Sequence, residues 1–304
     1  MPKRYRFITA DVFTDRMFGG NQLAVFTDGR GLDAATMQAI TREMNLSETV
    51  FVLPPETAGG TRRLRIFTPG KELPFAGHPT VGSAFVLTAI GEVPLDGELT
   101  RLVFEEGVGP VEVMVRAEAD RPVFAELSAA KLPELGPPPP SAEMIASVLS
   151  LKPSDIETGA RQPKAFSCGV PFLFVTVRDR DALARVRINQ EHWEHHVANY
   201  WATDIYVITH DAGDADIRAR MFAPDMGIAE DPATGGAATA LAGYLCPGNA
   251  SDGVLRWTIH QGVEMRRPST IFVEADIASG AITAIRVGGV SVLVSEGELT
   301  LPDQ

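Results

Sequence analysis

The feature that most constrains the fold is a weak repeat of the first half of the chain in the second. Its matches share an offset of 155 residues: residues 50–52 (VFV) with 205–207 (IYV), Arg65 and Phe67 with Arg220 and Phe222, and 107–108 (GV) with 262–263 (GV). With a gap of two residues, His78-Pro79 aligns with Asp231-Pro232, and each pair is expected to open a helix of small residues. A single period of half the chain predicts two copies of one domain rather than a solenoid.

A proline-rich run at residues 135–140 (LGPPPP) is expected to separate the two halves. Such a run cannot continue through the interior of a sheet or of a helix. We therefore predict one domain over residues 1–134 and a second over 141–304, whose last strand could return to the first domain. The length of 304 residues agrees, because a single hydrophobic core rarely grows beyond about 250–300 residues.

Each half is predicted to combine several strands with one long helix of small residues. Alternating or β-branched runs predict strands, and apolar residues spaced three and four apart predict helices. In the first half the strands are expected at residues 5–9, 23–26, 49–53, 63–67, 102–105 and 111–115, and the helices at 33–44 and 79–90. A sheet can wrap closely around a helix rich in Ala, Gly and Thr, so the expected class is α+β with strands around a central helix.

The composition excludes several classes of function. A net charge of -12 argues against nucleic acid as a partner, because phosphates require a basic surface. The sequence begins without an apolar signal core and has no uninterrupted apolar run of about 18 residues, so we expect a cytoplasmic protein without a membrane span. Cys168 and Cys246 form no C-x-x-C pair, so neither a zinc site nor a redox dithiol is indicated.

Two glycine-rich segments are the candidate binding elements, residues 75–83 (FAGHPTVGS) and 230–237 (EDPATGGA). The first turn of a helix exposes unpaired N–H groups and carries partial positive charge. Glycine lets a ligand approach that backbone closely, so such helix starts can bind a carboxylate or phosphate without Lys or Arg. The alternative is that both are ordinary capped helices.

Seven short segments follow one another in a familiar order. They are residues 11–14 (DVFT), 18–25 (FGGNQLAV), 45–49 (NLSET), 65–69 (RIFTP), 72–80 (ELPFAGHPT), 230–235 (EDPATG), and 261–262 (QG) with 267–269 (RPS). Together they resemble the signature of the phenazine-biosynthesis (PhzF-like) family along nearly the whole chain.

The resemblance implies a diaminopimelate epimerase-like fold, with two pseudo-symmetric domains and the active site between them. It also implies a homodimer and a reaction that needs neither metal nor organic cofactor. The family's type reaction isomerises trans-2,3-dihydro-3-hydroxyanthranilate: a glutamate removes a proton from a ring carbon and returns it elsewhere on the same face.

The matching glutamate is Glu48, although from position alone a carboxyl between a helix and a strand could equally be solvated. The residues that match the family's substrate-holding histidine and aspartate are His78 and Asp231. Backbone N–H groups near Gly77 and Gly235 are implied to receive the substrate carboxylate. The family pattern has Ser where this chain has Gly236, which supplies a backbone N–H but no hydroxyl, so Gly236 puts the phenazine substrate itself in doubt.

Three further interpretations remain open. An amino-acid epimerase or racemase needs an acid and a base on opposite faces of the substrate, and His78 is the evident partner for Glu48. A non-catalytic protein that binds a small acid would retain the same motifs. Zinc on His192 and His196, four residues apart, is the weakest, because the surrounding glutamates are typical of a solvated helix.

Overall fold

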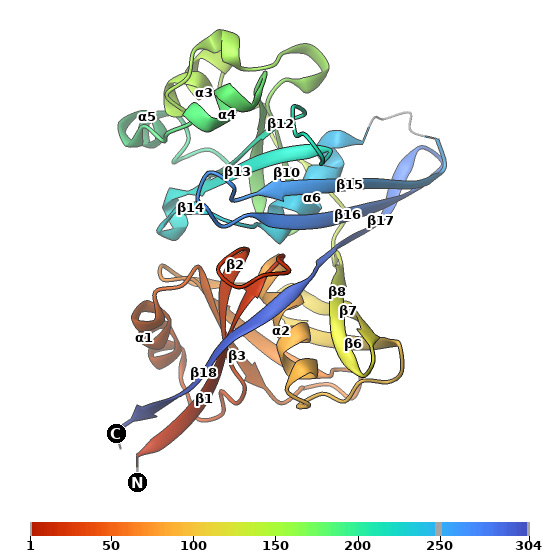
Figure 1. Ribbon diagram of the computed structural model, residues 1–304. Coiled ribbons are helices and arrows are strands. Elements are labelled where there is room, and N and C mark those ends of the chain that lie inside the picture. Colours follow the sequence, from red (N-terminus) through yellow and green to blue (C-terminus); the bar gives the residue numbers. More distant parts are fainter. Residues whose placement is uncertain (1, 247–250, 303–304) are drawn as a thin grey trace. The chain divides into compact units, whose positions relative to one another are not determined.

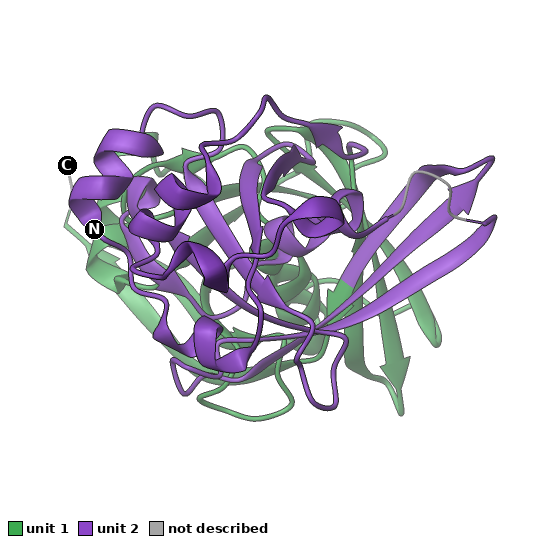
Figure 2. Cartoon of the chain, turned by 90° about the horizontal axis from the view of Figure 1, so that it is seen from above, with its two compact units in different colours: residues 1–130, 288–304 green, residues 131–287 purple. Residues whose placement is uncertain are grey.

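The computed structural model describes residues 2–246 and 251–302. The chain divides into two compact units (Figure 2). Unit 1 consists of Met1–Ala130 together with Gly288–Gln304, and unit 2 consists of Lys131–Val287. Each unit is described separately below, and Figure 1 labels the helices and strands.

Unit 1 is built on one mixed sheet. Its strands are β1 (Lys3–Val12), β2 (Asn21–Phe26), β3 (Glu48–Leu53), β4 (Arg62–Phe67), β5 (Glu72–Leu73), β6 (Leu99–Glu106), β7 (Gly109–Glu118), β8 (Arg121–Ser128) and β18 (Ser291–Leu301). The neighbours run β18-β1-β2-β3-β4-β6-β7-β8, and only the β2–β3 and β4–β6 pairs are parallel. The last strand along the chain, β18, thus pairs with the first, β1.

Helix α2 (Gly77–Ala89) lies inside the curve of this sheet and packs against β1, β2, β3, β7 and β8 (Figure 1). Every residue from Gly77 to Thr88 is buried, which explains why the segment has no polar face. The closest approach is at Gly82, where an added Cβ would lie 2.6 Å from side-chain atoms of both Leu23 and Val12. Small residues therefore let the sheet close around the helix.

Helix α1 (Ala34–Met44) covers the other face of the unit 1 sheet. Asp33 caps it by accepting a hydrogen bond from the Thr36 N–H at 2.8 Å. Met37 and Ile40 pack on an aromatic row formed by Phe26, Phe51 and Phe67. The three- and four-residue spacing of the apolar residues is thus satisfied by one buried face.

Unit 2 has a second mixed sheet with its own helices. The strands are β9 (Glu134–Leu135), β10 (Lys164–Ser167), β11 (Pro171–Thr176), β12 (Asp204–Thr209), β13 (Ile217–Ala223), β14 (Ile228–Asp231), β15 (Gly253–Gln261), β16 (Ser269–Ala278) and β17 (Ala281–Gly289). The helices are α3 (Ala142–Val148), α4 (Arg180–Arg185), α5 (Gln190–His196) and α6 (Gly235–Leu245). Helix α6 packs on β10, β11 and β16, while α3, α4 and α5 contribute to a separate apolar cluster with β11 and β12.

The pairing order in the two units is the same. Strands β10-β11-β12-β13-β15-β16 alternate antiparallel and parallel as β1-β2-β3-β4-β6-β7 do. In both units the long helix follows a short strand that pairs back on its neighbour, β5 on β4 and β14 on β13. The expected α+β class, with a curved sheet around a central helix, is confirmed.

The proline-rich run is attached to unit 2 at its start. Leu135 pairs with Phe166 at the edge of β10, and the Gly136 N–H donates to the Ala165 carbonyl at 2.8 Å. An edge position needs few ladder hydrogen bonds, so the prolines that follow leave the sheet without a conflict.

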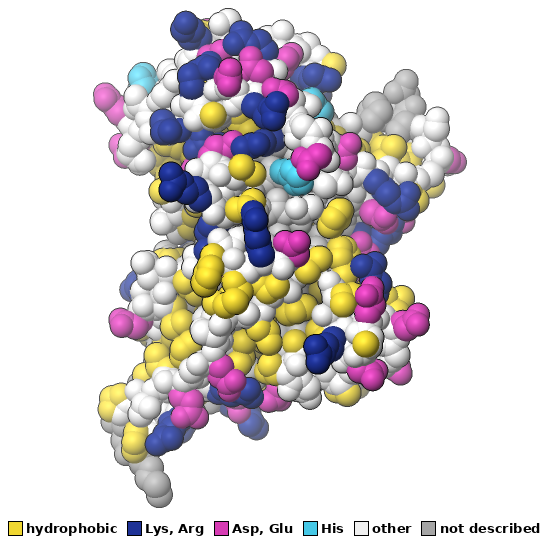
Figure 3. Space-filling view, viewed as in Figure 1, with side chains coloured by type: hydrophobic (Ala, Val, Ile, Leu, Met, Phe, Trp, Pro, Cys, Tyr) yellow, Lys and Arg dark blue, Asp and Glu magenta, His cyan; other side chains and the backbone are white. Residues whose placement is uncertain are grey.

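No helix in the described ranges is both long and apolar enough to span a membrane. On the face drawn in Figure 3, basic and acidic side chains are intermixed over unit 2, while hydrophobic side chains cover much of the middle of unit 1.

Candidate active site

Glu48 is the first residue of β3, and it lies opposite Leu23 of the parallel strand β2. Helix α1 ends at Asn45, which adopts a left-handed conformation (φ 49°, ψ 37°) and donates its N–H to the Thr41 carbonyl. Asparagine tolerates that conformation at a helix end. The chain therefore passes from helix to sheet within three residues. The Glu48 side chain is only 8% exposed, so the solvated alternative is wrong.

His78 is the second residue of α2 and lies directly against Glu48. Its Nε2 is 3.3 Å from Glu48 Oε2, and its side chain is 3% exposed. Both residues belong to unit 1, so one unit brings the predicted proton-transferring residue and the predicted substrate-holding histidine together. This contact joins two motifs that are 30 positions apart in the sequence.

Asn21, the first residue of β2, holds the other side of the His78 ring. Its Nδ2 is 3.1 Å from His78 Nδ1, and the residue is fully buried. An amide nitrogen can only donate, so Nδ1 is the acceptor and the single proton of a neutral ring lies on Nε2, facing Glu48. No role was predicted for Asn21, although the two glycines that precede it mark the start of a strand at a special turn.

Burial determines the charge of His78. It lowers the pKa of the imidazole to about 3, and a hydrogen bond with the Gln22 backbone opposes the effect only in part. His78 is therefore neutral at physiological pH. It thus places no full positive charge beside Glu48.

The loop before Asn21 is fixed by its own polar contacts. The buried Asp11 carboxylate accepts the Phe18 N–H at 2.6 Å, and the Thr14 N–H donates to the Val290 carbonyl at 3.0 Å. Gly20 has φ +59°, and a Cβ there would lie 2.2 Å from the Val12 carbonyl oxygen. Only glycine fits at that position, so this glycine determines where β2 begins and where Asn21 points.

The start of α2 has no side-chain cap. Gly77 is its first residue, and the N-cap, Ala76, makes no side-chain capping bond. Because Ala76 has no side-chain oxygen, the first N–H groups depend on other acceptors. Gly77 thus stands where the sequence predicted a carboxylate-binding N–H group.

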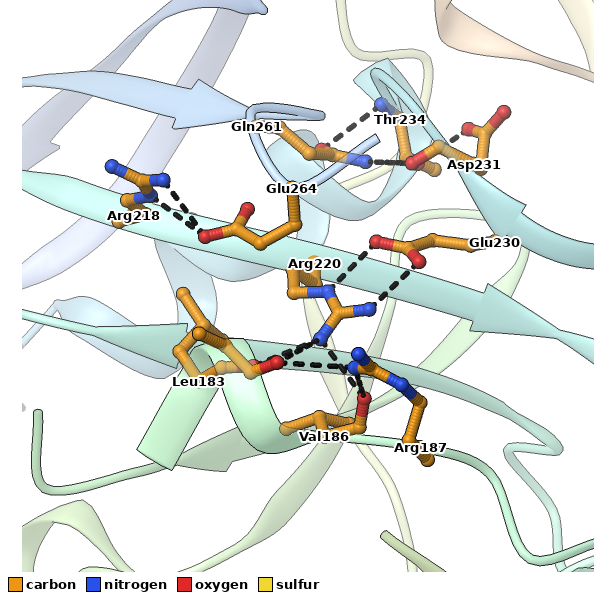
Figure 4. A network of polar contacts seen from close by, with 11 residues as sticks. Leu183, Val186, Arg187, Arg218, Arg220, Glu230, Asp231, Thr234, Gln261 and Glu264 are labelled. Carbon is orange, nitrogen blue, oxygen red and sulfur yellow. Dashed lines mark hydrogen bonds and ion pairs between the residues drawn. The ribbon is translucent and has the colours of Figure 1, made fainter. Parts of the chain in front are cut away.

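Asp231 is placed by a polar network in unit 2 (Figure 4). Its Oδ2 accepts the Thr234 hydroxyl at 2.5 Å, and its carbonyl accepts Gln261 Nε2 at 2.8 Å. Gln261 also donates to Thr234 Oγ1 at 3.0 Å, and its Oε1 accepts the Thr234 N–H at 3.2 Å and the Tyr206 hydroxyl at 2.9 Å. Burial raises the pKa of Tyr206, and the negative charge of Asp231 raises it further, so Tyr206 is a permanent donor.

One prediction about this segment is wrong: Asp231-Pro232 does not open a helix. Asp231 is still paired with Met221 in the β13–β14 ladder, and α6 begins only at Gly235. Gln261 holds the Asp231 carbonyl and the Thr234 N–H, which keeps the intervening residues out of the helix. By its place in the helix, the counterpart of His78 is Gly236, the second residue of α6, rather than Asp231.

Ion pairs beside the two helix starts support this correspondence. In unit 1 Arg65 donates twice to Glu72, and in unit 2 Arg220 donates twice to Glu230 (Figure 4). Arg220 is 4% exposed, and its remaining nitrogen reaches the Leu183 and Val186 carbonyls. Each glutamate lies five residues before the first glycine of its helix. Both pairs anchor the strand that leads into the helix.

Gly235 and Gly236 are the first two residues of α6, whose N-cap, Thr234, makes no side-chain capping bond. A Cβ at Gly236 would meet only the Phe172 ring, at 3.7 Å. That distance is ordinary van der Waals contact, so no described neighbour of Gly236 requires glycine there. The missing hydroxyl is therefore a property of this sequence rather than a demand of the fold.

Other candidates for chemistry give no comparable arrangement. Among the described residues, no group of three or more His, Cys, Asp or Glu side chains is arranged to hold a metal ion. The rings of His192 and His196 stack at 5.9 Å on α5. Burial raises the pKa of the Cys168 thiol to about 12, which leaves no thiolate for two-thiol racemisation.

Comparison with known sequences gives consistent matches. A family model described as "Phenazine biosynthesis-like protein" (PhzC-PhzF) matches residues 10–297. An "uncharacterized isomerase" of Mesorhizobium japonicum is 40% identical over 96% of this chain and 98% of its own length. The trans-2,3-dihydro-3-hydroxyanthranilate isomerase of Pseudomonas aeruginosa is 33% identical over 98% of this chain and its entire length.

Solved structures match the fold along the whole chain. The PhzF-family phenazine biosynthesis protein of Bacillus anthracis has a TM-score of 0.86 at 25% identity, covering 98% of this chain and 99% of its own. A hydroxyproline epimerase of Agrobacterium vitis matches with a TM-score of 0.67 at 12% identity, covering 99% and 93%. The second likeness concerns the fold alone.

Proposed function

Because the chain belongs to the phenazine biosynthesis-like (PhzC-PhzF) family, we propose that Glu48 is its proton-transferring residue, acting on a small carboxylate-bearing substrate without metal or organic cofactor. The reaction class follows from the family: the relatives are isomerases, and so is this protein. What remains to be proposed is how its residues carry the reaction and on which substrate.

The observation that carries the proposal is the contact between Glu48 Oε2 and His78 Nε2 at 3.3 Å, in a place where both side chains are buried. A base that removes a proton from carbon must be ionised beforehand and must keep the proton until it is returned. An imidazolium beside it would hold the carboxylate ionised and weaken it as a base. The neutral His78 instead lies against Glu48 without adding a positive charge.

In the proposed cycle, the Glu48 carboxylate accepts a proton from a substrate carbon and then donates it to another carbon on the same face. The backbone N–H groups of Gly77 in unit 1 and of Gly235 in unit 2 are each suited to bind a carboxylate, since helix starts favour anions. His78 and Asp231 hold the substrate's other polar groups. Atoms balance within the substrate, because the proton that leaves one carbon reaches the other.

The substrate is proposed to be a small cyclic or unsaturated acid, similar to the one in the name of the Pseudomonas aeruginosa relative. Gly236 is the reason to expect a difference from that compound. A side-chain hydroxyl commonly contributes about 0.5–1.5 kcal/mol through a hydrogen bond. A substrate that lacks a polar group beside Gly236 would not need it.

The decisive experiment is proton NMR in D2O with trans-2,3-dihydro-3-hydroxyanthranilate and a panel of small amino and hydroxy acids. The wild-type chain is compared with Glu48→Gln and with Glu43→Gln, which changes an exposed glutamate on α1. We expect isomerisation, or deuterium entering one carbon, in the wild type and in Glu43→Gln. Loss of a general base commonly costs about 10²–10⁴-fold in rate, so Glu48→Gln should be nearly silent.

A Gly236→Ser variant added to this assay tests the substrate question, because a Cβ there would make only ordinary contact with the Phe172 ring. Faster turnover of trans-2,3-dihydro-3-hydroxyanthranilate by this variant would indicate that Gly236 determines substrate specificity. If Glu48→Gln exchanges protons as fast as the wild type, the mechanism is wrong. If compounds bind equally to all variants and none is turned over, the non-catalytic interpretation replaces it. Exchange at one α-carbon with inversion would favour the epimerase.

We further propose that the two halves, residues 1–134 and 141–304 with the last strand returned to the first domain, arose by internal duplication, and that the protein is a cytoplasmic homodimer. The common pairing order of β1–β7 and β10–β16 supports the duplication. Sedimentation of the purified chain tests the dimer.

A further inference from the structure

Glu106 is a titratable residue next to α2 that the proposed reaction does not use. It is the last residue of β6 and pairs with Gly109 across a tight hairpin. The hairpin is pressed onto the start of α2: a Cβ on Gly107 would lie 2.8 Å from Pro74 Cα, and the Val108 N–H donates to the Pro74 carbonyl at 3.0 Å. The Glu106 carboxyl thereby reaches the first turn of the helix that carries His78.

The single hydroxyl proton of Thr80 indicates whether the Glu106 carboxyl is protonated. Thr80 Oγ1 lies 2.7 Å from the Ala76 carbonyl oxygen and 2.6 Å from Glu106 Oε1. A hydroxyl has one proton, while a carbonyl and a carboxylate can only accept. Both short contacts are satisfied at once if the hydroxyl donates to Ala76 and a protonated Glu106 donates to the hydroxyl.

The surroundings favour that neutral form. The residue is half-buried, but Glu106 Oε2 is fully buried and has no hydrogen-bond partner among the described residues. Burial raises the pKa of Glu106 to about 8, and the Thr80 hydrogen bond opposes this only in part. The positive end of α2 also opposes it.

The charged side chains nearby have other partners. Arg63 pairs with Glu56, and Arg65 pairs with Glu72. Glu105 accepts the backbone N–H groups of Glu56 and Thr57. These five charged side chains line the same cavity as Glu106. On α2 itself, His78 is neutral and contacts Glu48. None of these ion pairs includes Glu106.

Unit 2 has a neutral donor at the corresponding place. Gln261 ends β15 as Glu106 ends β6, and the next residue, Gly262, is pressed on Pro232 as Gly107 is on Pro74. Gln261 Nε2 donates to the Thr234 hydroxyl at the start of α6 at 3.0 Å. A carboxylic acid and a carboxamide supply the same kind of bond here, which makes Glu106→Gln a close mimic of the protonated side chain.

We propose that protonated Glu106 is a positioning residue: through Thr80 it holds the first turn of α2, and so keeps His78 beside Glu48. Ionisation of Glu106 removes the donated proton and leaves two acceptors facing the Thr80 hydroxyl, so the turn loosens at alkaline pH. The effect on turnover rests on the proposed function; the protonation state and the position of His78 do not.

The first test needs no variant. Carboxyl ¹³C NMR of glutamate-labelled wild-type protein should show one carboxylic acid that stays protonated at neutral pH and ionises near pH 8. The same signal should be absent from Glu106→Gln and present in Glu112→Gln, a control on the exposed face of β7. Absence of any protonated glutamate at pH 7 in the wild type would overturn the proposal.

The second test is the pH profile of kcat/KM and of the His78 imidazole ¹⁵N signals. In the wild type both should change on the alkaline side with one midpoint, and in Glu106→Gln both should remain flat there. Glu106→Ala, which cannot donate, should lose about tenfold or more in kcat/KM at pH 7, since small misplacements in a site are costly. A Glu106→Gln enzyme as impaired as Glu106→Ala would argue against positioning through a donated proton. If no substrate is turned over, the proposed function fails, while the NMR signals still decide the role of Glu106.

Discussion

At the scale of single residues, the site depends on a histidine that stays uncharged. His78 lies between Asn21 and Glu48, and the amide of Asn21 determines which ring nitrogen carries the proton. A free imidazole would be partly protonated just below neutral pH. Burial therefore keeps the His78 ring neutral at a pH where a free imidazole would begin to take up a proton.

The pH dependence of the free energy of unfolding tests whether His78 stays neutral in the folded chain. The pKa of His78 falls from 6.5 to about 3 on folding, so the unfolded chain binds a proton on this residue at a pH where the folded chain does not. Stability from the neutral His78 is then present above about pH 6.5 and is lost as the pH falls through about 3. We expect ¹⁵N NMR to report a neutral Nε2–H ring from pH 8 down to pH 5, with free histidine in the sample titrating as a reference. An imidazolium signal for His78 at pH 5 would refute this assignment.

At the scale of elements, the position of α2 depends on a glycine as well as on its packed side chains. Gly82 lets the helix approach Val12 of β1 and Leu23 of β2, and an added methyl would be 2.6 Å from both side chains. The same close approach keeps Gly77 and His78 at the inner face of the sheet.

Gly82→Ala should therefore destabilise the protein by about 1–3 kcal/mol, the usual cost of overpacking a core. The result is informative because alanine in an open helix would instead stabilise by up to about 1 kcal/mol. Urea unfolding measures the difference, and Gly59→Ala is a matched control, since nothing lies within 4 Å of a Cβ at that loop position. A Gly82→Ala protein as stable as the wild type would show that the strands move apart easily.

Local patterns predicted most elements of the first half. The helix expected at residues 33–44 is α1, and the β-branched run and the alternating run form β3 and β4. The start of α6 was misplaced because a non-local residue decides it: Gln261 keeps Asp231 in the strand. Pattern reasoning identifies a helix-forming segment but not a side chain 30 residues away that delays its first turn.

Only part of the site was predictable, because sequence patterns do not show long-range contacts. Family motifs identify Glu48 and His78, and the structure places them in contact. Asn21 and Glu106 were missed as functional candidates because their significance comes only from long-range contacts, with His78 and with Thr80. Their burial states, which set their chemistry, depend on the closed sheet rather than on neighbouring sequence.

At the scale of the whole molecule, unit 1 is assembled from both ends of the described chain. Strand β18 pairs with β1 along its length, from Val12 opposite Ser291 to Lys3 opposite Leu301. Leu299 and Leu301 also pack against the aromatic cluster under α1. Residues 288–302 thus cover a sheet edge and part of a core.

A chain that ends at Val287 should keep unit 2 but lose protection in unit 1. Without β18, the N–H and C=O groups of β1 form an open edge, which invites exchange and aggregation. Hydrogen exchange should become faster in β1 and β2 and remain unchanged in β11 and β12, compared with the full chain. Equal protection of β1 in both chains would mean that β18 contributes little to the sheet.

The pairing of β18 with β1 also affects the order in which the two units can complete folding during synthesis. Domains generally fold as units while the chain emerges from the ribosome. Unit 2 is continuous in sequence, so all of its strands are available once residue 287 has been released. Unit 1 begins to emerge first, yet its outer strand is translated last, and β1 must wait through the synthesis of the whole of unit 2 for its partner. The half of the protein that contains Glu48 and His78 is therefore the half that finishes folding later.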